Sequence, residues 1–155
     1  MKLLVFSDSH GNVANMADVV RREEPDQILH LGDVVRDARA LAEQFPDIPL
    51  TFVCGNCDGR VDVPDQLLLT VEGKKIMLTH GHIYGVKSGM GLAVKAAREA
   101  EADVLLFGHT HKAFCDLIGE MWVMNPGTIG SWMPRTYGVV RITEAGIVCY
   151  TEPFA

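Results

Sequence analysis

Residues 3–12 read Leu3-Leu4-Val5-Phe6-Ser7-Asp8-Ser9-His10-Gly11-Asn12, an apolar run that turns abruptly polar. The apolar half is typical of a strand buried on both faces of a parallel sheet. The polar half supplies a carboxylate and an imidazole at the point where that strand should end. This stretch therefore predicts an α/β sheet with metal-binding side chains beyond its strands.

Four further segments repeat this pattern later in the chain. Each follows an apolar run and contains Asp, Asn or His. They are Gly32-Asp33, Gly55-Asn56-Cys57-Asp58, His80-Gly81-His82 and Gly108-His109-Thr110-His111. Ligands of open α/β sheets bind beyond the carboxyl ends of the strands, so these segments predict one shared site.

The first half of the chain alternates strands and helices. Asn12 is the expected N-cap of a helix that stops at Glu24-Pro25, because the residue before a proline avoids helical geometry. A strand over 27–31, a helix over 36–45 and a strand over 50–53 follow. This alternation is typical of a parallel sheet with crossover helices.

Hairpins dominate the second half. Their strand pairs are 66–71 with 74–79, 113–118 with 121–124, and 137–143 with 146–151. A helix over about 91–102 and a strand over 104–107 follow the first hairpin. We therefore expect residues 1–155 to form a single α/β domain of two mixed sheets packed together, with helices outside.

The composition narrows the function classes. A chain of 155 residues suits one domain with a core, and 48% hydrophobic with 22% charged residues is ordinary for a folded protein. A formal net charge of −6 does not indicate a nucleic-acid partner. The apolar runs are too short for a secretory signal or a membrane span, so we expect a cytoplasmic protein without a membrane partner.

Seven residues of the five segments offer oxygen and nitrogen ligands. They are Asp8, His10, Asp33, Asn56, His80, His109 and His111. Such ligands suit manganese, iron, zinc or nickel. Seven exceed the need of one ion with open positions, so they can hold two ions that share a bridging carboxylate. Two ions would acidify a bridging water to hydroxide and offset charge on phosphoryl oxygens, which indicates a small phosphate ester as substrate.

Two arrangements of the last histidine pair stay open at this point. His109 and His111 are two residues apart and would share one face of an extended segment. A turn at Gly108 or Thr110 would instead aim them at different ions. Asn12, at the start of a helix, would add a favourable environment for an anion nearby.

The joint pattern resembles the calcineurin-like metallophosphoesterase superfamily. Its motifs here are Asp8-Ser9-His10, Gly32-Asp33, Gly55-Asn56-Cys57-Asp58, Thr79-His80-Gly81-His82 and Gly108-His109-Thr110-His111. Asn125-Pro126-Gly127-Thr128, followed by Met133-Pro134-Arg135, is similar to the short stand-alone prokaryotic branch of phosphodiesterases. The resemblance covers the chain from residue 3 to about 143.

The resemblance implies a four-layer α-β-β-α sandwich and a metal-dependent phosphodiesterase with two divalent ions, typically manganese or nickel. One ion would be held by Asp8, His10, Asp33 and His111. The other would be held by Asp33, Asn56, His80 and His109, which makes Asp33 the bridging catalytic residue. Asn12, Cys57, His82 and Arg135 are candidates for substrate binding.

One position departs from the family pattern. Many members carry a histidine after the metal-binding asparagine, where this chain has Cys57. A thiol is a poor substitute for an imidazolium that protonates a leaving group, so esters with poor leaving groups should react slowly. His82 would take over that role if it reaches the substrate.

Two other functions are carried as alternatives. The first is a catalytically weak protein-interaction module, for which the small phosphoesterase-like subunit of retromer is a precedent in the family. The second is thiol redox chemistry at Cys54 and Cys57, a C-x-x-C pair, although we favour a packing role for Cys54.

Three structural roles are also expected. His30 lies inside an apolar run and should be a hydrogen-bonded core residue. Asp58 should orient its loop rather than bind a metal. Exposed Met and Trp side chains near residues 121–133 would support a homo-oligomer.

Overall fold

The apolar run at the start of the chain forms strand β1 (Lys2–Phe6), the middle strand of a sheet. Successive side chains of a strand point to opposite faces. Leu3 and Val5 therefore join one buried cluster, and Leu4 and Phe6 join another on the opposite face. The predicted burial of both faces of this strand is confirmed.

The structure is a computed structural model that describes residues 1–59, 62–130 and 134–155. After β1 its elements are α1 (Val13–Glu23), β2 (Gln27–His30), α2 (Val35–Gln44), β3 (Leu50–Phe52), β4 (Gln66–Val71), β5 (Lys74–Thr79), a 3-10 helix (His82–Tyr84), α3 (Gly91–Glu99), β6 (Val104–Phe107), β7 (Phe114–Ile118), β8 (Met121–Asn125), β9 (Thr136–Thr143) and β10 (Gly146–Pro153).

The predicted helices and strands are confirmed, with small differences at their ends. Helix α3 ends at Glu99 rather than near Ala102, because Glu101 has a φ of 58° that no right-handed helix can accommodate. The 3-10 helix after His80-Gly81 was not predicted. Asn12 precedes α1 as expected, but its side chain makes no capping hydrogen bond.

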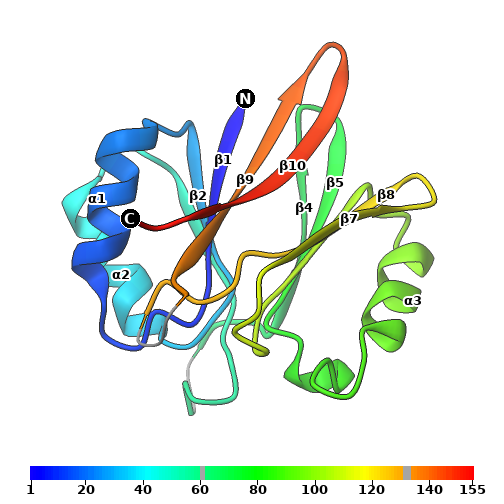
Figure 1. The fold of residues 1–155 in the computed structure, drawn as a ribbon, viewed down its shortest axis with the longest axis horizontal. Helices are drawn as coiled ribbons and strands as arrows, with labels where there is room; N and C mark the ends of the chain where they lie inside the picture. The colour runs from blue at the N-terminus through cyan, green and yellow to red at the C-terminus, as the bar shows by residue number, and fades with distance from the viewer. Residues whose placement is uncertain (60–61, 131–133) are drawn as a thin grey trace.

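Two five-stranded mixed sheets form the centre of the molecule. Their strand orders are β10-β9-β1-β2-β3 and β4-β5-β6-β8-β7. Strands β1, β2 and β3 pair in parallel, as do β5, β6 and β8, while the hairpins pair antiparallel. Helices α1 and α2 lie outside one sheet and α3 lies outside the other, which confirms the four-layer sandwich (Figure 1).

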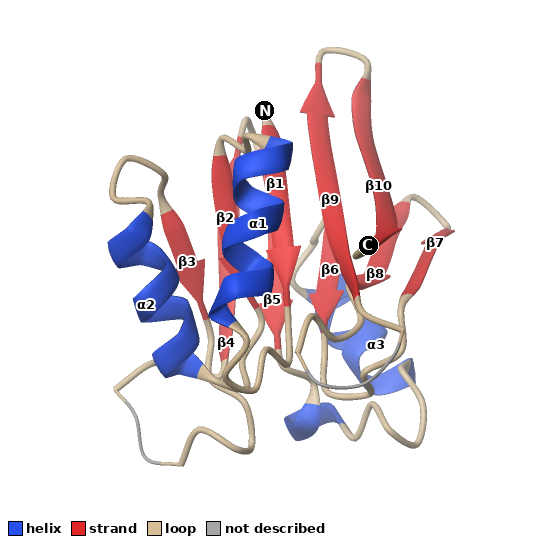
Figure 2. Ribbon diagram, turned by 60° about the vertical axis from the view of Figure 1, so that its left-hand side comes forward, coloured by secondary structure: helices blue, strands red, loops and turns tan. Residues whose placement is uncertain are grey.

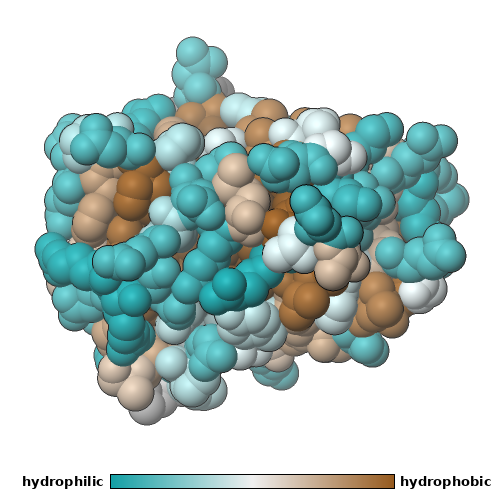
Figure 3. All heavy atoms as spheres, turned by 90° about the horizontal axis from the view of Figure 1, so that it is seen from above, coloured by the Kyte–Doolittle hydropathy of each residue, from teal (hydrophilic) through white to brown (hydrophobic). Residues whose placement is uncertain are grey.

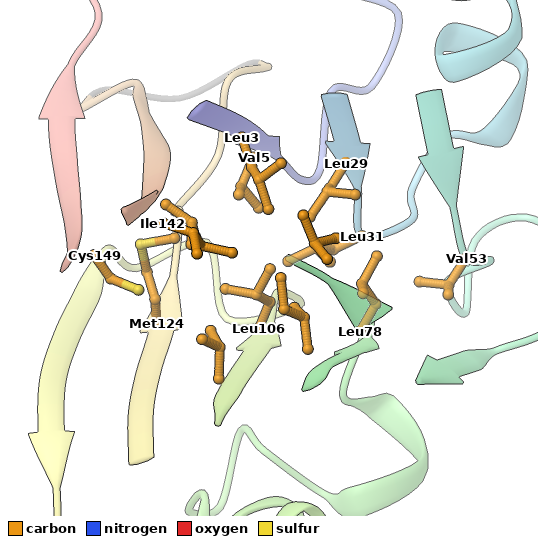
Figure 4. Close-up of a cluster of buried hydrophobic side chains, with 14 residues drawn as sticks. Leu3, Val5, Leu29, Leu31, Val53, Leu78, Leu106, Met124, Ile142 and Cys149 are labelled. Atoms are coloured by element: carbon orange, nitrogen blue, oxygen red, sulfur yellow. The ribbon is translucent and has the colours of Figure 1, made fainter. Parts of the chain in front are cut away.

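Apolar side chains fill the space between the two sheets (Figure 4). Leu29 and Leu31 from one sheet meet Leu78 and Leu106 from the other, and all four side chains are fully buried. Because both sheets contribute to one core, the parallel strands of both are held in a fixed relation. Their carboxyl ends, where the ligand segments begin, are therefore fixed as well.

The expectation of exposed apolar side chains near residues 121–133 is wrong for two methionines. Met121 and Met124 are 5% and 0% exposed and belong to the cores on the two faces of their sheet. The Trp122 indole N–H donates to the carbonyl of Ile147 at 3.0 Å. Trp132 and Met133 lie outside the described residues, so a homo-oligomer stays a prediction.

In the described part of the chain, no helix has the length and apolar character needed to cross a membrane. The end of the sandwich that carries the N-terminus and the β9–β10 turn is seen in Figure 3, where hydrophilic residues cover much of the surface. The ligand segments lie at the other end, below the sheets in Figure 2.

The core between the two sheets can be tested by removing one methylene group from it. Ile76 is fully buried in β5, so Ile76→Val should lower the free energy of unfolding by about 1 kcal/mol through lost packing. Urea denaturation would measure the change. Ile83 is 46% exposed, so Ile83→Val should change the same quantity by less than about 0.5 kcal/mol. Equal effects of the two substitutions would contradict the assignment of Ile76 to the core.

Candidate metal centre

The five polar segments meet at one edge of the sandwich. They follow the ends of β1, β2, β3, β5 and β6. Figure 2 shows the loops after these strands together at the lower end of the two sheets. The prediction of one shared edge, made from chain-distant segments, is confirmed.

Backbone conformation marks the same residues. Asp8, His10, Asp33, His109 and His111 have φ angles of 54°, 43°, 44°, 71° and 63°. Such values lie in the left-handed region, which residues other than glycine enter infrequently. Five expected ligands in this region indicate that the surrounding contacts impose the conformation, as is common at functional sites.

Asp8 lies at the centre of a first group with His10 and His111. Oδ1 of Asp8 is 3.2 Å from Nε2 of His111 and 3.9 Å from Nε2 of His10. The other oxygen, Oδ2, accepts hydrogen bonds from the Ser7 hydroxyl at 2.6 Å and the His109 N–H at 3.1 Å. Oδ1 is buried and has no hydrogen-bond partner among the described residues. This oxygen therefore lies near the imidazole nitrogens of His10 and His111 and is available as a ligand.

His80 belongs to a second group with Asp8 and Asp33. Its Nδ1 lies 2.8 Å from the carbonyl of Leu31, which can only accept, so Nδ1 carries the proton. In the neutral ring, Nε2 then presents its lone pair. That nitrogen lies 3.4 Å from Oδ2 of Asp33 and 3.7 Å from Oδ1 of Asp8. The backbone contact thus fixes the tautomer that a metal ligand requires.

The two groups share a carboxylate. In each, one ligand atom per residue lies within 4.8 Å of the others: Asp8 with His10 and His111, and Asp8 with Asp33 and His80. The residue common to both is Asp8, whereas Asp33 was expected to bridge. The bridging role of Asp33 stays a prediction that a variant of each aspartate can test.

The remaining histidines of the site are His109 and His82. Nδ1 of His109 is 3.2 Å from Nε2 of His80, so His109 stands on the His80 side. His10 and His111 pack together on the other side, with ring centroids 5.4 Å apart. His109 and His111 therefore point to different groups, which agrees with the arrangement that has a turn at Gly108 or Thr110. The His82 ring lies 5.5 Å from that of His80, and its Nδ1 is buried without a hydrogen-bond partner among the described residues.

Asp33 is held by the segment that contains Asn56 and Cys57. Its Oδ1 accepts the backbone N–H of Cys57 at 2.9 Å, which leaves Oδ2 for the site. Gly55 permits this contact, because a Cβ at that position would overlap the Asp33 carboxylate. Asp58 accepts the N–H groups of Gly55, Asp33 and Val35 at 2.6, 3.1 and 2.7 Å. Asp58 therefore orients two loops, as predicted.

Two predicted site residues are less tightly placed. The Asn56 and Cys57 side chains are exposed, and the Asn56 amide lies 3.7 Å from the Cys57 sulfur. Asn56 as a metal ligand stays a prediction. A hydrogen bond to Asp33, then burial, raises the pKa of the Cys57 thiol, and burial followed by the charge of Asp65 raises that of Cys54. Raised values lower the thiolate fraction and disfavour the redox alternative.

Asn12 and Arg135 converge on one carbonyl. Nδ2 of Asn12 donates to the carbonyl of Gly130 at 2.8 Å, and Nε of Arg135 donates to the same oxygen at 3.2 Å. Gly130 packs on the Asp8–Ser9 backbone, since an added Cβ would lie 2.5 Å from both carbonyl oxygens. The two candidates thus stand beside the first loop of the site. Their contact with substrate stays a prediction.

A buried polar network behind the site was only partly predicted. His30 is fully buried, as expected of a core histidine, and burial lowers its pKa to about 4. Its Nδ1 accepts the N–H of Gly32 at 3.1 Å, so Nε2–H donates to the Ser9 hydroxyl at 3.0 Å. Ser9 in turn donates to Asp37 at 2.8 Å, and Asp37 also accepts the N–H of Gly11 at 2.6 Å.

Asp37 was missed although a signal for it exists. The side chain is 2% exposed on α2, on the same face as Leu41 one turn later. A charged residue inside an apolar stripe is unusual unless it is paired. The helix was predicted from its apolar periodicity alone, and the charged residue within the apolar stripe was not interpreted.

The pKa values of the site residues reflect attraction between its carboxylates and its histidines. Burial alone would raise the pKa of Asp8 and of Asp33. At Asp8, interactions with His111 and His80 outweigh the effect of burial, so its pKa is lowered. At Asp33, His80 and the Cys57 N–H outweigh burial in the same way, and the pKa of Asp33 is also lowered. Burial lowers the pKa of His80, but Asp33 and Asp8 raise it overall, and the close contact with the Asp8 carboxylate raises the pKa of His111. A cation placed between these groups would satisfy the same charges.

These features fit a divalent metal. The donor set contains anionic oxygens and imidazole nitrogens, which is typical of manganese, iron, zinc or nickel. The buried Oδ1 of Asp8, which has no hydrogen-bond partner among the described residues, is costly to bury alone, and a bound cation would compensate that cost. A two-sheet sandwich with this centre at the carboxyl ends of its strands defines a metal-dependent phosphoesterase.

Comparison with known proteins leads to the same class. Residues 1–145 match the family described as the calcineurin-like phosphoesterase superfamily domain. The chain belongs to this family, and the resemblance noted in the sequence is confirmed.

Relatives agree on the class. The probable metallophosphoesterase YsnB of Bacillus subtilis is 37% identical over 98% of this chain and 85% of its own length. The phosphodiesterase YfcE of Escherichia coli K12 is 29% identical over 98% of this chain and 94% of its own. The structure of vacuolar protein sorting 29 from Cryptosporidium parvum superposes with a TM-score of 0.76 at 16% identity, covering 99% of this chain and 97% of that one. At that identity the last comparison shows the fold alone.

Proposed function

We propose that the chain hydrolyses phosphodiesters at a centre of two divalent ions. One ion would bind Asp8, His10, Asp33 and His111, and the other would bind Asp33, Asn56, His80 and His109. The observation that carries the proposal is the buried Oδ1 of Asp8, which lies among imidazole nitrogens and has no hydrogen-bond partner in the described part of the chain. The relative YfcE is named a phosphodiesterase, which supports the diester as substrate class.

When bound, the two ions supply an acidified water as nucleophile and offset charge on the phosphoryl oxygens. The protein's part is to hold the ligands in place. Leu31 fixes the His80 tautomer, the Cys57 N–H and Asp58 hold Asp33, and the Ser7 hydroxyl holds Asp8. His82 and Cys57 stand beside this arrangement as the candidates for contact with the leaving group.

Metal removal provides the central test. Dialysis against a chelator should reduce hydrolysis of bis(p-nitrophenyl) phosphate to the uncatalysed rate, because the nucleophile and the charge compensation are both lost. Manganese should restore it, and nickel, iron and zinc should be compared at equal concentration. Metal analysis before and after dialysis would give the number of ions per chain.

The alternative is a protein-interaction module that keeps the fold without efficient catalysis. The likeness to vacuolar protein sorting 29 and the cysteine at position 57 are the observations on its side. Bound ions without turnover of p-nitrophenyl diesters or monoesters, whichever metal is added, would decide for it. Action on a small ester in the cytoplasm stays a prediction.

A further inference from the structure

A cleft opens beside the metal centre on the side of α3. Its volume is about 710 Å³. Two segments form it, one leading into α3 and one leading into β7. The residues that line it are Val86, Lys87, Ser88, Gly89, Met90, Phe107, Thr110, Lys112, Ala113, Phe114 and Asn125. Thr110 stands between His109 and His111 in the chain, so the cleft is continuous with the ligand loop.

The charge of this cleft is opposite to that of the protein. The chain has a formal net charge of −6, yet the lining contains Lys87 and Lys112 and, among the described residues, no carboxylate. A hollow of about 470 Å³ at the opposite end of the strands has the reverse character, with Asp26, Glu72 and Glu144 in its wall. The cleft beside the metal centre is therefore the place where an anion is attracted.

Apolar side chains form the rest of the cleft wall. Phe107 is 4% exposed and Val86 is 5% exposed, and both belong to the core between α3 and its sheet. Met90 and Phe114 pack against that core and remain partly exposed. A wall of two aromatic rings and a methionine suits a planar ring, through stacking and contact with sulfur.

The cleft is held close to the reacting position by hydrogen bonds. Nδ2 of Asn125 donates to the Gly108 carbonyl at 3.1 Å and to the Thr110 hydroxyl at 2.9 Å, which fixes the loop that carries both histidines. Lys87 lines the same cleft as Thr110, the residue between the two histidines of that loop. One substrate can thus reach both the metal centre and Lys87.

We propose that this cleft binds the non-reacting part of the substrate, and that the substrate is a phosphodiester bearing an aromatic ring and a second anionic group. The ring packs on Phe114 and Met90. The second anion pairs with Lys87 and Lys112. This assignment rests on the proposed function of the metal centre and specifies its substrate class.

Competitive inhibition can separate the two features of the proposed ligand. Ribose 5-phosphate, adenosine 5′-monophosphate and adenosine 3′,5′-bisphosphate share one phosphate and add first a ring and then a second phosphate. Inhibition constants against bis(p-nitrophenyl) phosphate should fall about tenfold with each addition, since one well-placed charged hydrogen bond or aromatic contact is worth that factor. The manganese-loaded protein is used throughout.

Variants of the two lysines test whether they cause the tighter inhibition expected from the second phosphate. The double variant Lys87→Ala and Lys112→Ala should remove the advantage of the bisphosphate over the monophosphate, and Lys87→Arg with Lys112→Arg should keep it. Lys95→Ala, on the exposed face of α3, is the matched control and should retain the full tenfold advantage. Equal inhibition by both nucleotides in the unaltered protein, or an advantage that survives in the double variant, would overturn the proposal.

Calorimetry of the same compounds keeps the two hypotheses apart. Binding to the manganese-loaded protein can be measured whether or not the protein turns over a diester. Hydrolysis without preference for the bisphosphate would reject the cleft assignment alone. Preferential binding without hydrolysis would support the cleft and reject the proposed function.

Discussion

An Asp33→Ala variant is expected to lose at least about a thousandfold in turnover of bis(p-nitrophenyl) phosphate, equivalent to about 4 kcal/mol of transition-state stabilisation. Asp33 is 2% exposed and directs Oδ2 at Nε2 of His80, while its Oδ1 is held by Cys57. Removing the carboxylate would take away a predicted anionic ligand beside His80. Steady-state kinetics at saturating manganese would measure the loss.

The fold should survive this substitution, because Asp33 lies in a loop after β2 and outside the hydrophobic clusters. Circular dichroism and cooperative thermal unfolding would confirm that. Asp47→Ala, at an exposed position in the loop before β3, is the matched control and should keep full turnover. Turnover within tenfold of the unaltered protein would show that Asp33 is not an essential ligand.

Metal content tells which aspartate bridges the ions. If both ions share Asp33, Asp33→Ala should weaken the binding of both. The amount of metal bound per chain should then fall further than in a variant of a ligand that only one ion uses. Asp8 is common to the two ligand groups of the structure, so Asp8→Ala is the direct comparison. Loss of both ions from Asp8→Ala and of one from Asp33→Ala would move the bridge to Asp8.

The sequence was sufficient for the fold because its local signals agree with one another. Continuous apolar runs such as Val104–Phe107 predict strands buried on both faces, and Glu72-Gly73 predicts a hairpin between strands of matched length. Those elements form as predicted, with β6 fully buried and β4 paired to β5 from Gln66 to Val71. Chain order then brings the carboxyl ends of the parallel strands to one edge.

The arrangement inside the site was less accessible, because it depends on contacts between segments far apart in the chain. Asp33 is positioned by Asp58, 25 residues away, and the His80 tautomer is set by Leu31, 49 residues away. No periodicity encodes such pairs. The exposure of the Asn56 side chain and the presence of Asp8 in both ligand groups are likewise not contained in the pattern of residue types. A pattern of residue types names the ligands but does not orient them.

Asp37→Ala should lower the free energy of unfolding by about 3 kcal/mol and weaken metal binding, although Asp37 is not a predicted ligand. The substitution leaves the buried Ser9 hydroxyl and the Gly11 N–H without their acceptor, and each such group costs about 1–3 kcal/mol. Ser9 and Gly11 flank His10. Loss of such supporting contacts commonly reduces metal affinity by about tenfold to a hundredfold.

Urea denaturation of the metal-free protein and manganese titration would measure the two effects of Asp37→Ala separately. Asp37→Asn keeps one acceptor oxygen, so its free energy of unfolding should lie between those of the unaltered protein and the Asp37→Ala variant. Asp18→Ala, on an exposed face of α1, removes only a surface pair with Arg21 and should cost less than about 0.5 kcal/mol. His30, which stays neutral with its pKa near 4, already uses its one acceptor nitrogen, Nδ1, for the Gly32 N–H, so it cannot accept from Ser9 or Gly11 in place of Asp37. A stability equal to that of Asp18→Ala would mean that the network does not hold the first ligand loop in place.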